Sequence, residues 1–226
     1  MSRKKQANQN PFLPVSKADM EARGWDWYDF LIVNGDAYVD HPSFGGVVIA
    51  RTLEAEGYRV AFLPQPDWHS ADAFLAMGKP RLAVMLSSGN LDSMVAHYTA
   101  AKKRRRQDAY SPGYQTGLRP DRAVIVYANR VREAFSDTPL IIGGLEASLR
   151  RFAHYDYWSN QVRRAILFDA RADLLIYGMG EAATLEIAAQ LNAGVPVSDI
   201  TTVRGTSFAA REREACVYPW VEVPSY

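Results

Sequence analysis

Two successive units of buried strand, glycine turn and helix constrain the fold of this chain more than any other feature. The first unit covers residues 139–150 and turns at Gly143 and Gly144. The second covers residues 173–194 and turns at Gly178. In each unit an apolar run of strand length stops at glycine and is followed by good helix formers. Such repeated units imply parallel strands, whose turns lie together at the carboxyl edge of one sheet.

Five apolar runs in all have the length of a buried strand, at residues 28–33, 58–63, 81–86, 139–142 and 173–177. They predict an α/β fold, with a three-layer, flavodoxin- or Rossmann-like parallel sheet of about five strands and helices on both faces. Right-handed crossovers predict the strand order 2-1-3-4-5. Residues 201–204 are a candidate for an added edge strand.

Helical patterns occupy the segments between these runs, with apolar residues at spacings of three and four or with capping and stop signals. The predicted helices cover residues 47–56, 70–78, 91–101, 120–135, 145–150 and 181–194. Residues 123–127 taken alone also fit a strand, and we prefer the helix because its apolar face continues to Phe135.

The sequence divides into three parts. Residues 1–24 are polar and interrupted by prolines, which predicts an extended arm that wraps the domain or is disordered. Residues 25–205 carry the α/β pattern and are predicted to form one domain. Residues 206–226 contain Pro219 and Pro224 and are predicted to be the start of a linker. The chain has 226 residues, of which 48% are hydrophobic, which is enough for a substantial core.

Charge and cysteine content exclude several classes of protein. The formal net charge is +1, so bulk charge indicates no polyanionic partner. The single cysteine, Cys216, cannot form an internal disulfide, a four-cysteine zinc site or an iron–sulfur cluster. No signal peptide core is visible and no run reaches the roughly twenty apolar residues of a membrane span. We therefore expect a cytoplasmic protein without a membrane partner.

Small or polar residues end four of the five predicted strands. They are Asn34, Gly35, Asp36, Ser87, Ser88, Gly143, Gly144, Gly178, Gly180 and Glu181, and the loop after the first strand adds His41, Ser43 and Gly45. Each glycine alone is more simply explained by a tight turn. Their convergence at one edge favours a cleft for a cofactor or substrate, where backbone amides and helix amino ends favour anionic groups such as phosphate.

Sequence motifs of established chemistries are missing. Thr184 stands where a dinucleotide fingerprint needs its third glycine, and there is no phosphate-binding loop, nucleophile elbow or catalytic triad spacing. His41 beside Asp40 is compatible with an acid–base or metal-ligand pair, but a histidine without a second ligand is more often a loop residue. We expect neither a catalytic residue nor a metal ligand in this chain.

A basic run and an aromatic group have two interpretations each. The run is Lys102, Lys103, Arg104, Arg105 and Arg106, and Tyr110 and Tyr114 follow it. The simpler interpretation is that these cations lie in solvent at the carboxyl end of the predicted helix 91–101, where they favour the macrodipole, because nothing else in the chain makes a basic stripe. The alternative is that they bind an RNA backbone while the tyrosines stack on bases. For the aromatic group of Phe152, Tyr155, Tyr157 and Trp158 we prefer a role in packing, and a docking surface is the alternative.

Long motifs in the chain resemble the amino-terminal region of the YgiQ-type radical SAM proteins. These motifs cover residues 11–14, 33–45, 108–110, 119–123, 142–151, 154–158 and 177–181. The glycine turns at Gly143-Gly144 and Gly178-Met179-Gly180 are also similar to those of the cobalamin-binding-like Rossmann domain that precedes many radical SAM barrels.

The resemblance implies a domain placed before a catalytic barrel. Such a barrel binds a [4Fe–4S] cluster through a C-x3-C-x2-C loop and cleaves S-adenosylmethionine to a radical. This chain has no such loop, so the resemblance implies that residues 206–226 lead toward a barrel and that the chain alone is not catalytic. The cobalamin motif D-x-H-x-x-G is not met, because Asp40 and His41 are adjacent and Gly45 lies four residues beyond the histidine. Another axial ligand and the absence of cobalamin both stay open.

Three hypotheses follow. In the first, the chain is an accessory domain that covers a radical SAM barrel and holds a substrate or cofactor at the sheet edge. In the second, it is a stand-alone module for a small anionic ligand. In the third, the basic run 102–106 docks the domain on an RNA substrate.

Overall fold

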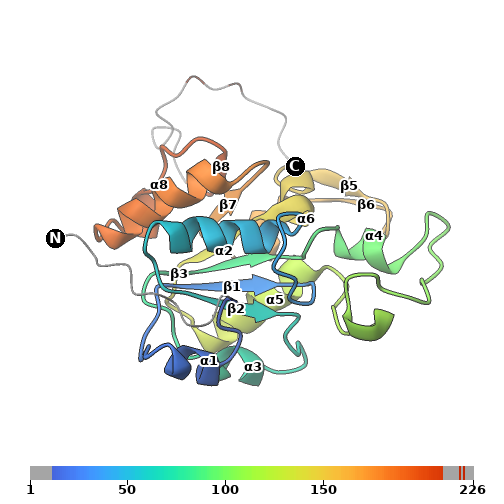
Figure 1. Cartoon of the computed structure of the whole chain (residues 1–226). Coiled ribbons are helices and arrows are strands. Elements are labelled where there is room, and N and C mark those ends of the chain that lie inside the picture. The colour runs from blue at the N-terminus through green and yellow to red at the C-terminus, as the bar shows by residue number, and fades with distance from the viewer. Residues whose placement is uncertain (1–11, 211–218, 220, 222–226) are drawn as a thin grey trace.

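The computed structural model describes residues 12–210, 219 and 221, and it forms a six-stranded sheet with helices on both faces (Figure 1). The sheet order is β2-β1-β3-β4-β7-β8, in which the first five strands are parallel and β8 is antiparallel to β7. The predicted order 2-1-3-4-5 and the α/β fold class are therefore confirmed. The strands are β1 (Phe30–Asn34), β2 (Val60–Pro64), β3 (Ala83–Ser87), β4 (Leu140–Ile142), β7 (Leu174–Ile176) and β8 (Thr206–Phe208).

The helices divide into two layers. The longer ones are α2 (Gly45–Ala55), α5 (Ala123–Ala134) and α8 (Glu181–Asn192), and the shorter ones are α1 (Lys17–Ala22), α3 (Asp72–Ala76), α4 (Ser93–His97), α6 (Gly144–Leu149) and α7 (Ile166–Asp169), with one-turn 3₁₀ helices at η1 (Pro112–Tyr114) and η2 (Val197–Asp199). In Figure 1, α2 and α8 lie above the sheet, and α1 and α3 lie below it.

Each face of the sheet has its own core because side chains alternate along a strand. One core joins Leu31 and Val33 of β1 to Phe74 of α3 and Tyr127 of α5. The other joins Ile32 of β1 to residues of α2 and α8, such as Leu53 and Ile187. β1 and β4 are buried along their full length and β3 is buried from Ala83 to Leu86, which explains why these strands appear in the sequence as apolar runs.

Four segments differ from the sequence prediction. The predicted arm contains α1, and Leu13 is buried while the carbonyl of Pro14 accepts a hydrogen bond from the Phe62 amide. The edge strand lies at 206–208 instead of 201–204, within the segment predicted as linker. The aromatic segment enters a hairpin of β5 (His154–Asp156) and β6 (Gln161–Arg163).

The fourth difference is α4, which ends at His97 instead of near residue 101. Tyr98 is extended, and its hydroxyl donates a hydrogen bond of 2.7 Å to Asp121. His97 Nδ1 lies 2.7 Å from the other oxygen of that carboxylate. These long-range contacts replace the last helical turn that the apolar spacing predicts.

None of the helices in the part of the chain that the structure describes has the length and apolar character needed to cross a bilayer. The cytoplasmic location and the predicted domain boundaries stay predictions. Residues 1–11, Cys216 and most of the predicted linker lie outside the described residues.

Candidate functional site

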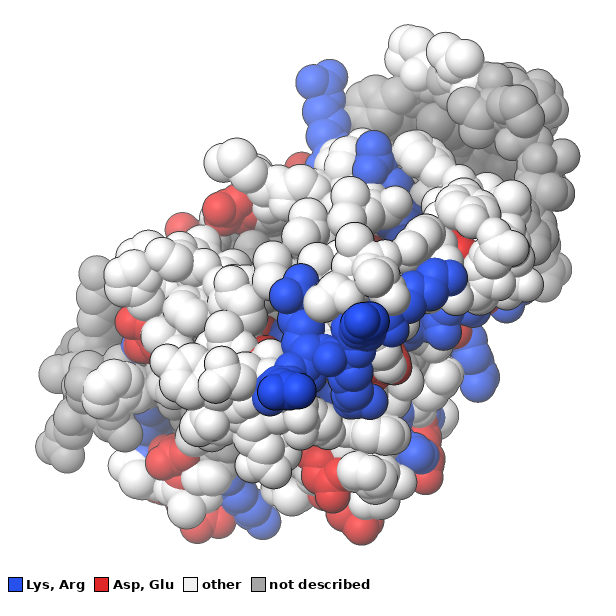
Figure 2. All heavy atoms as spheres, turned by 90° about the vertical axis from the view of Figure 1, so that its right-hand side faces the viewer, with Lys and Arg blue, Asp and Glu red and all other residues white. Residues whose placement is uncertain are grey.

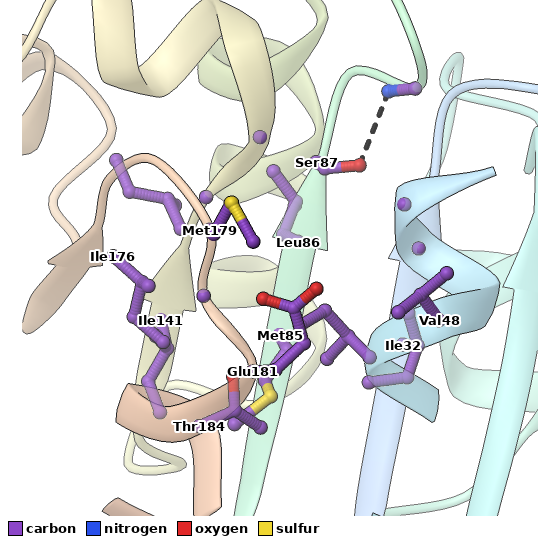
Figure 3. Close-up of a pocket in the computed structure, with 18 of the residues that line it drawn as sticks. Ile32, Val48, Met85, Leu86, Ser87, Ile141, Ile176, Met179, Glu181 and Thr184 are labelled. Atoms are coloured by element: carbon purple, nitrogen blue, oxygen red, sulfur yellow. Dashed lines mark hydrogen bonds between the residues drawn. The ribbon is translucent and has the colours of Figure 1, made fainter. Parts of the chain in front are cut away.

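A pocket of about 340 Å³ lies at the carboxyl edge of the sheet, where β3, β4 and β7 end (Figure 3). Its floor is formed by strand residues such as Met85 and Ile141, and its walls come from α2 and α8. Of the residues that the sequence predicts for a cleft, those that line the pocket are Ser43, Gly45, Ser87, Gly143, Gly144, Gly178, Gly180 and Glu181. The glycine turns after β4 and β7 thus meet around one cavity.

Two of these glycines are required by close approach. Gly144 has φ +79°, in the left-handed region, and a Cβ there would lie 3.0 Å from the Cβ of Ser87. A Cβ on Gly180 would lie 2.9 Å from the Cγ2 of Ile176. Side chains at these positions would push the turns away from the strand ends. The glycines therefore hold two turns close against the rim of the pocket.

The pocket is mostly apolar, with few polar groups. Ile32, Val48 and Ile176 are among its apolar side chains. In Figure 3 the carboxylate of Glu181 lies among them, at the first residue of α8. Thr184, which is 1% exposed, lines the same wall, and its Oγ1 has no hydrogen-bond partner among the described residues. A buried hydroxyl without a partner is costly unless a ligand or water satisfies it.

Glu181 changes the ligand chemistry that the sequence predicts. Both α2 and α8 begin at the pocket, and helix amino ends attract anions. The Glu181 carboxylate already occupies the start of α8 and repels a second anion there. The pocket therefore suits an apolar body that carries a hydrogen-bond donor or a cation better than it suits a phosphate.

The end of β1 contributes to a buried network instead of the pocket. Asn34, Gly35, Asp36 and Ser88 were predicted for the cleft, but none of them lines it. Asn34 Oδ1 accepts a 2.9 Å hydrogen bond from the Ser87 hydroxyl. A Cβ on Gly35 would lie 2.2 Å from the carbonyl oxygen of Ser88, so Gly35 allows two strand ends to pack in contact.

Arg119 is the centre of that network, and sequence reasoning missed it. Its guanidinium is fully buried and donates to Asp36 at 2.7 Å, to the Ser88 carbonyl at 3.0 Å and to both carboxylate oxygens of Asp108 at 2.8 and 2.9 Å. Burial raises the pKa of Asp36 to about 6, and the amide of Asn90 and the charge of Arg119 limit that rise. The network fixes the loops beside the pocket; it does not open to it.

A second buried network surrounds α4. Glu146 is 1% exposed and accepts backbone hydrogen bonds from Ser93 at 2.9 Å and Val124 at 3.1 Å, so it caps the start of α5 from a distant helix. Burial raises the pKa of Glu146. Burial alone would also raise the pKa of Asp121, but hydrogen bonds from Tyr98 and His97 hold it below its usual value. No sequence pattern indicates these long-range caps.

His41 is exposed and lies outside the pocket lining, and its Nδ1 accepts a 3.1 Å hydrogen bond from the Ser43 amide. That contact fits the loop role that the sequence favours. No group of three or more His, Cys, Asp or Glu among the described residues is arranged to hold a metal ion. The described residues therefore do not fit a [4Fe–4S] cluster, and an exposed His41 outside the cavity does not fit a lower ligand of cobalamin.

The basic run 102–106 is exposed and occupies an irregular loop after α4. The expected exposure to solvent is observed, but the expected place at a helix carboxyl end is wrong, because α4 ends at His97. The ring of Tyr110 packs edge-on against the ring of Phe44, with 6.2 Å between the ring centres, so it is engaged in a packing contact. Tyr114 is 59% exposed.

Comparison with known proteins gives a consistent result. The family described as Radical SAM N-terminal matches residues 12–226. A UPF0313 protein of Clostridium botulinum is 54% identical over 215 residues, which are 95% of this chain and 34% of that protein. UPF0313 proteins of Geobacter sulfurreducens and Pseudomonas aeruginosa are 53% and 54% identical over the same share of this chain and 36% and 28% of their own lengths. The chain thus spans about a third of the length of the curated relatives that it matches.

Proposed function

Because this chain belongs to the radical SAM N-terminal family, as the resemblance predicted, we propose that it is the accessory domain of a radical SAM enzyme and holds a small ligand at the carboxyl edge of its sheet. The observation that carries the proposal is the pocket of about 340 Å³, which lies within the size range of small-molecule sites. We assign the radical chemistry to the remainder of the longer protein, because this chain has a single cysteine and a [4Fe–4S] cluster is held by several.

The proposed ligand has an apolar or aromatic body and a donor group. The apolar walls around Met85 and Ile176 would cover the body, Glu181 would pair with a cationic or N–H group, and the Thr184 hydroxyl would gain a partner. Cobalamin is not part of the proposal, because His41 offers no ligand inside the pocket. The ligand would instead be a substrate or part of one.

An apolar rim beside the pocket supports the accessory role. Leu149 on α6 is 60% exposed, Tyr177 is 37% exposed and Met179 is 90% exposed. The Gly178 amide donates a 3.2 Å hydrogen bond to the Ser148 hydroxyl, which holds α6 and the turn after β7 side by side. Large exposed side chains in such a group indicate an interaction surface. We assign this rim to contact with the radical SAM barrel, which would then close the pocket.

Methyl NMR of the methionines tests the pocket directly. Tryptamine, an aromatic ring with a cationic amine, serves as the probe, and indole-3-propionate is the matched anion. Tryptamine is expected to shift the methyl signals of Met85 and Met179, which line the pocket, but not those of Met20 and Met77, which lie in the other core. Glu181→Gln is expected to remove the preference for the cation. Equal shifts at all four methyls, or none at millimolar tryptamine, would rule out the proposed pocket.

A further inference from the structure

The loop at residues 102–106 presents five consecutive cations without acidic partners. All five side chains are exposed, and none of them lies within 4.0 Å of an Asp or Glu carboxylate among the described residues. Arg104 is close enough to Asp121 to lower the pKa of that carboxyl, but the two form no ion pair. The remaining positive charge is therefore available to an outside polyanion.

Backbone hydrogen bonds hold this loop in a fixed conformation. The Thr99 amide donates to the Lys103 carbonyl at 2.9 Å, and the Lys102 amide donates to the Thr99 carbonyl at 2.9 Å. Tyr98 and Arg104 pair as an isolated antiparallel bridge, and the Arg105 amide donates to His97 at 2.7 Å. An ordered loop presents its charges at a smaller entropic cost than a flexible tail would.

Aromatic residues from a distant part of the sequence lie against the basic loop. The Tyr157 hydroxyl donates to the Ala100 carbonyl at 2.6 Å, and the Lys102 ammonium lies 4.6 Å from the centre of the Tyr157 ring. The Trp158 ring lies 5.3 Å from the rings of both Tyr157 and Tyr98. Tyr157 is still 47% exposed. The aromatic segment, for which the sequence favours packing, thus lies against the basic run, for which nucleic-acid binding is the alternative interpretation.

The arrows of β1 and β2 point toward the right of Figure 1, and Figure 2 looks at that side of the molecule. Lys and Arg side chains gather near the middle of this face, and most of the surface around them is uncharged. The loop that carries residues 102–106 follows β3 and α4, so it leaves the same end of the sheet as the turns that form the pocket.

We propose that this basic–aromatic surface, formed by residues 102–106 with Tyr98, Tyr157 and Trp158, binds single-stranded nucleic acid. Phosphates would lie on the cations, and unpaired bases would stack on the exposed ring of Tyr157 and on Trp158. A duplex hides its base faces, so it could use only the charges. An acidic peptide would likewise leave the aromatic residues unused, which makes single strands the partner that uses both halves of the surface.

Fluorescence anisotropy with a labelled twelve-nucleotide oligouridine tests this proposal on the 226-residue chain. The variant Lys103→Gln/Arg106→Gln removes two cations whose side chains make no hydrogen bond or ion pair within the described residues, so folding should be unaffected. Each phosphate contact on a single strand contributes about 0.7 to the salt slope, so the slope should fall by about 1.4 and binding at 0.1 M salt should weaken about 25-fold. Lys17→Gln/Arg171→Gln is the matched control, because both cations are exposed elsewhere on the molecule and their side chains also make no hydrogen bond or ion pair within the described residues.

Tryptophan fluorescence provides an independent readout of stacking. Oligouridine should quench the emission, and Trp158→Phe should abolish most of that quenching while leaving the salt slope unchanged. Tighter binding of either RNA or DNA of matched sequence identifies the preferred sugar and supports the proposal. Absence of binding, an equal loss in the control variant, or equal affinity for a glutamate dodecapeptide or for phosphatidylserine vesicles would overturn it.

Discussion

Arg119 donates a hydrogen bond of 2.7 Å to Asp36 across a separation of 83 residues in the sequence, and both side chains are fully buried. The same guanidinium binds Asp108 through two oxygens. This contact ties the loop after β1 to the irregular segment before α5. Because it lies beneath the loops at the carboxyl edge, the stability of that edge depends on it.

Arg119→Met should destabilise the chain strongly. The variant leaves two carboxylates buried without their counter-charge, and breaking a buried pair in this way costs about 3–5 kcal/mol. Urea unfolding followed by circular dichroism measures the change. Arg164→Met is the control, because Arg164 is mostly exposed and pairs with Asp169 at the surface, where such pairs contribute about 0–1 kcal/mol. Equal losses for the two variants would contradict the assignment.

Asp36 should make the chain less stable as pH rises from 4 to 6. Its pKa is raised from 3.8 to about 6, so the folded state holds this proton more tightly than the unfolded state does. The stabilisation is complete below pH 4 and is lost as pH rises through 6, which corresponds to about 3 kcal/mol. Denaturation at stepped pH measures it. Asp36→Asn should flatten the slope in this window, and an unchanged slope would show that another group causes it.

Gly35→Ala should destabilise the chain, whereas Gly45→Ala should not. A Cβ on Gly35 would lie 2.2 Å from the Ser88 carbonyl oxygen, and a Cβ on Gly45 would meet nothing within 4 Å. Overpacking of this kind costs about 1–3 kcal/mol. Thermal unfolding of the two variants gives the comparison. Similar midpoints would mean that the strand ends are not in the close contact described.

Val48→Trp should fill the pocket and weaken tryptamine binding at least tenfold. Val48 lines the cavity from α2, and a larger ring there would occupy the space between α2 and β3. Val48→Ala, which enlarges the cavity, is the matched control and should retain binding. Isothermal titration measures both. Retained affinity in the tryptophan variant would place the tryptamine elsewhere.

Leu149→Glu, made at the equivalent position of a full-length relative, should loosen the contact between this domain and the rest of the protein. Leu149 is exposed on α6 beside the pocket, and a buried carboxylate would be costly at an interface. Hydrogen exchange should show faster exchange in α6 and in the segment that covers it. Leu75→Glu, at a position on α3 that is 51% exposed, is the control. Unchanged exchange at α6 would remove this rim from the interface.

The sequence was sufficient to predict the parallel strands of the sheet and their order. Apolar runs of strand length, glycine stops and the right-handed crossover rule are local or general properties, and they predicted the order of β1, β2, β3, β4 and β7 correctly. The same signals placed the turns of Gly144 and Gly180 at one edge, and the pocket lies there. The long motifs also indicated the correct family.

The tertiary structure alone decided which edge residues face the pocket and which are buried. Asp36 and Gly144 both follow strands, but Asp36 is turned inward by Arg119, a residue that no local pattern links to it. Likewise α4 ends early because His97 and Tyr98 bind Asp121, and the basic loop meets Trp158 because the β5–β6 hairpin folds back on it. Such contacts depend on hydrogen bonds, ion pairs and packing between side chains that are far apart in the sequence. Sequence periodicity reports only on neighbours within one strand or helix, so it cannot predict them.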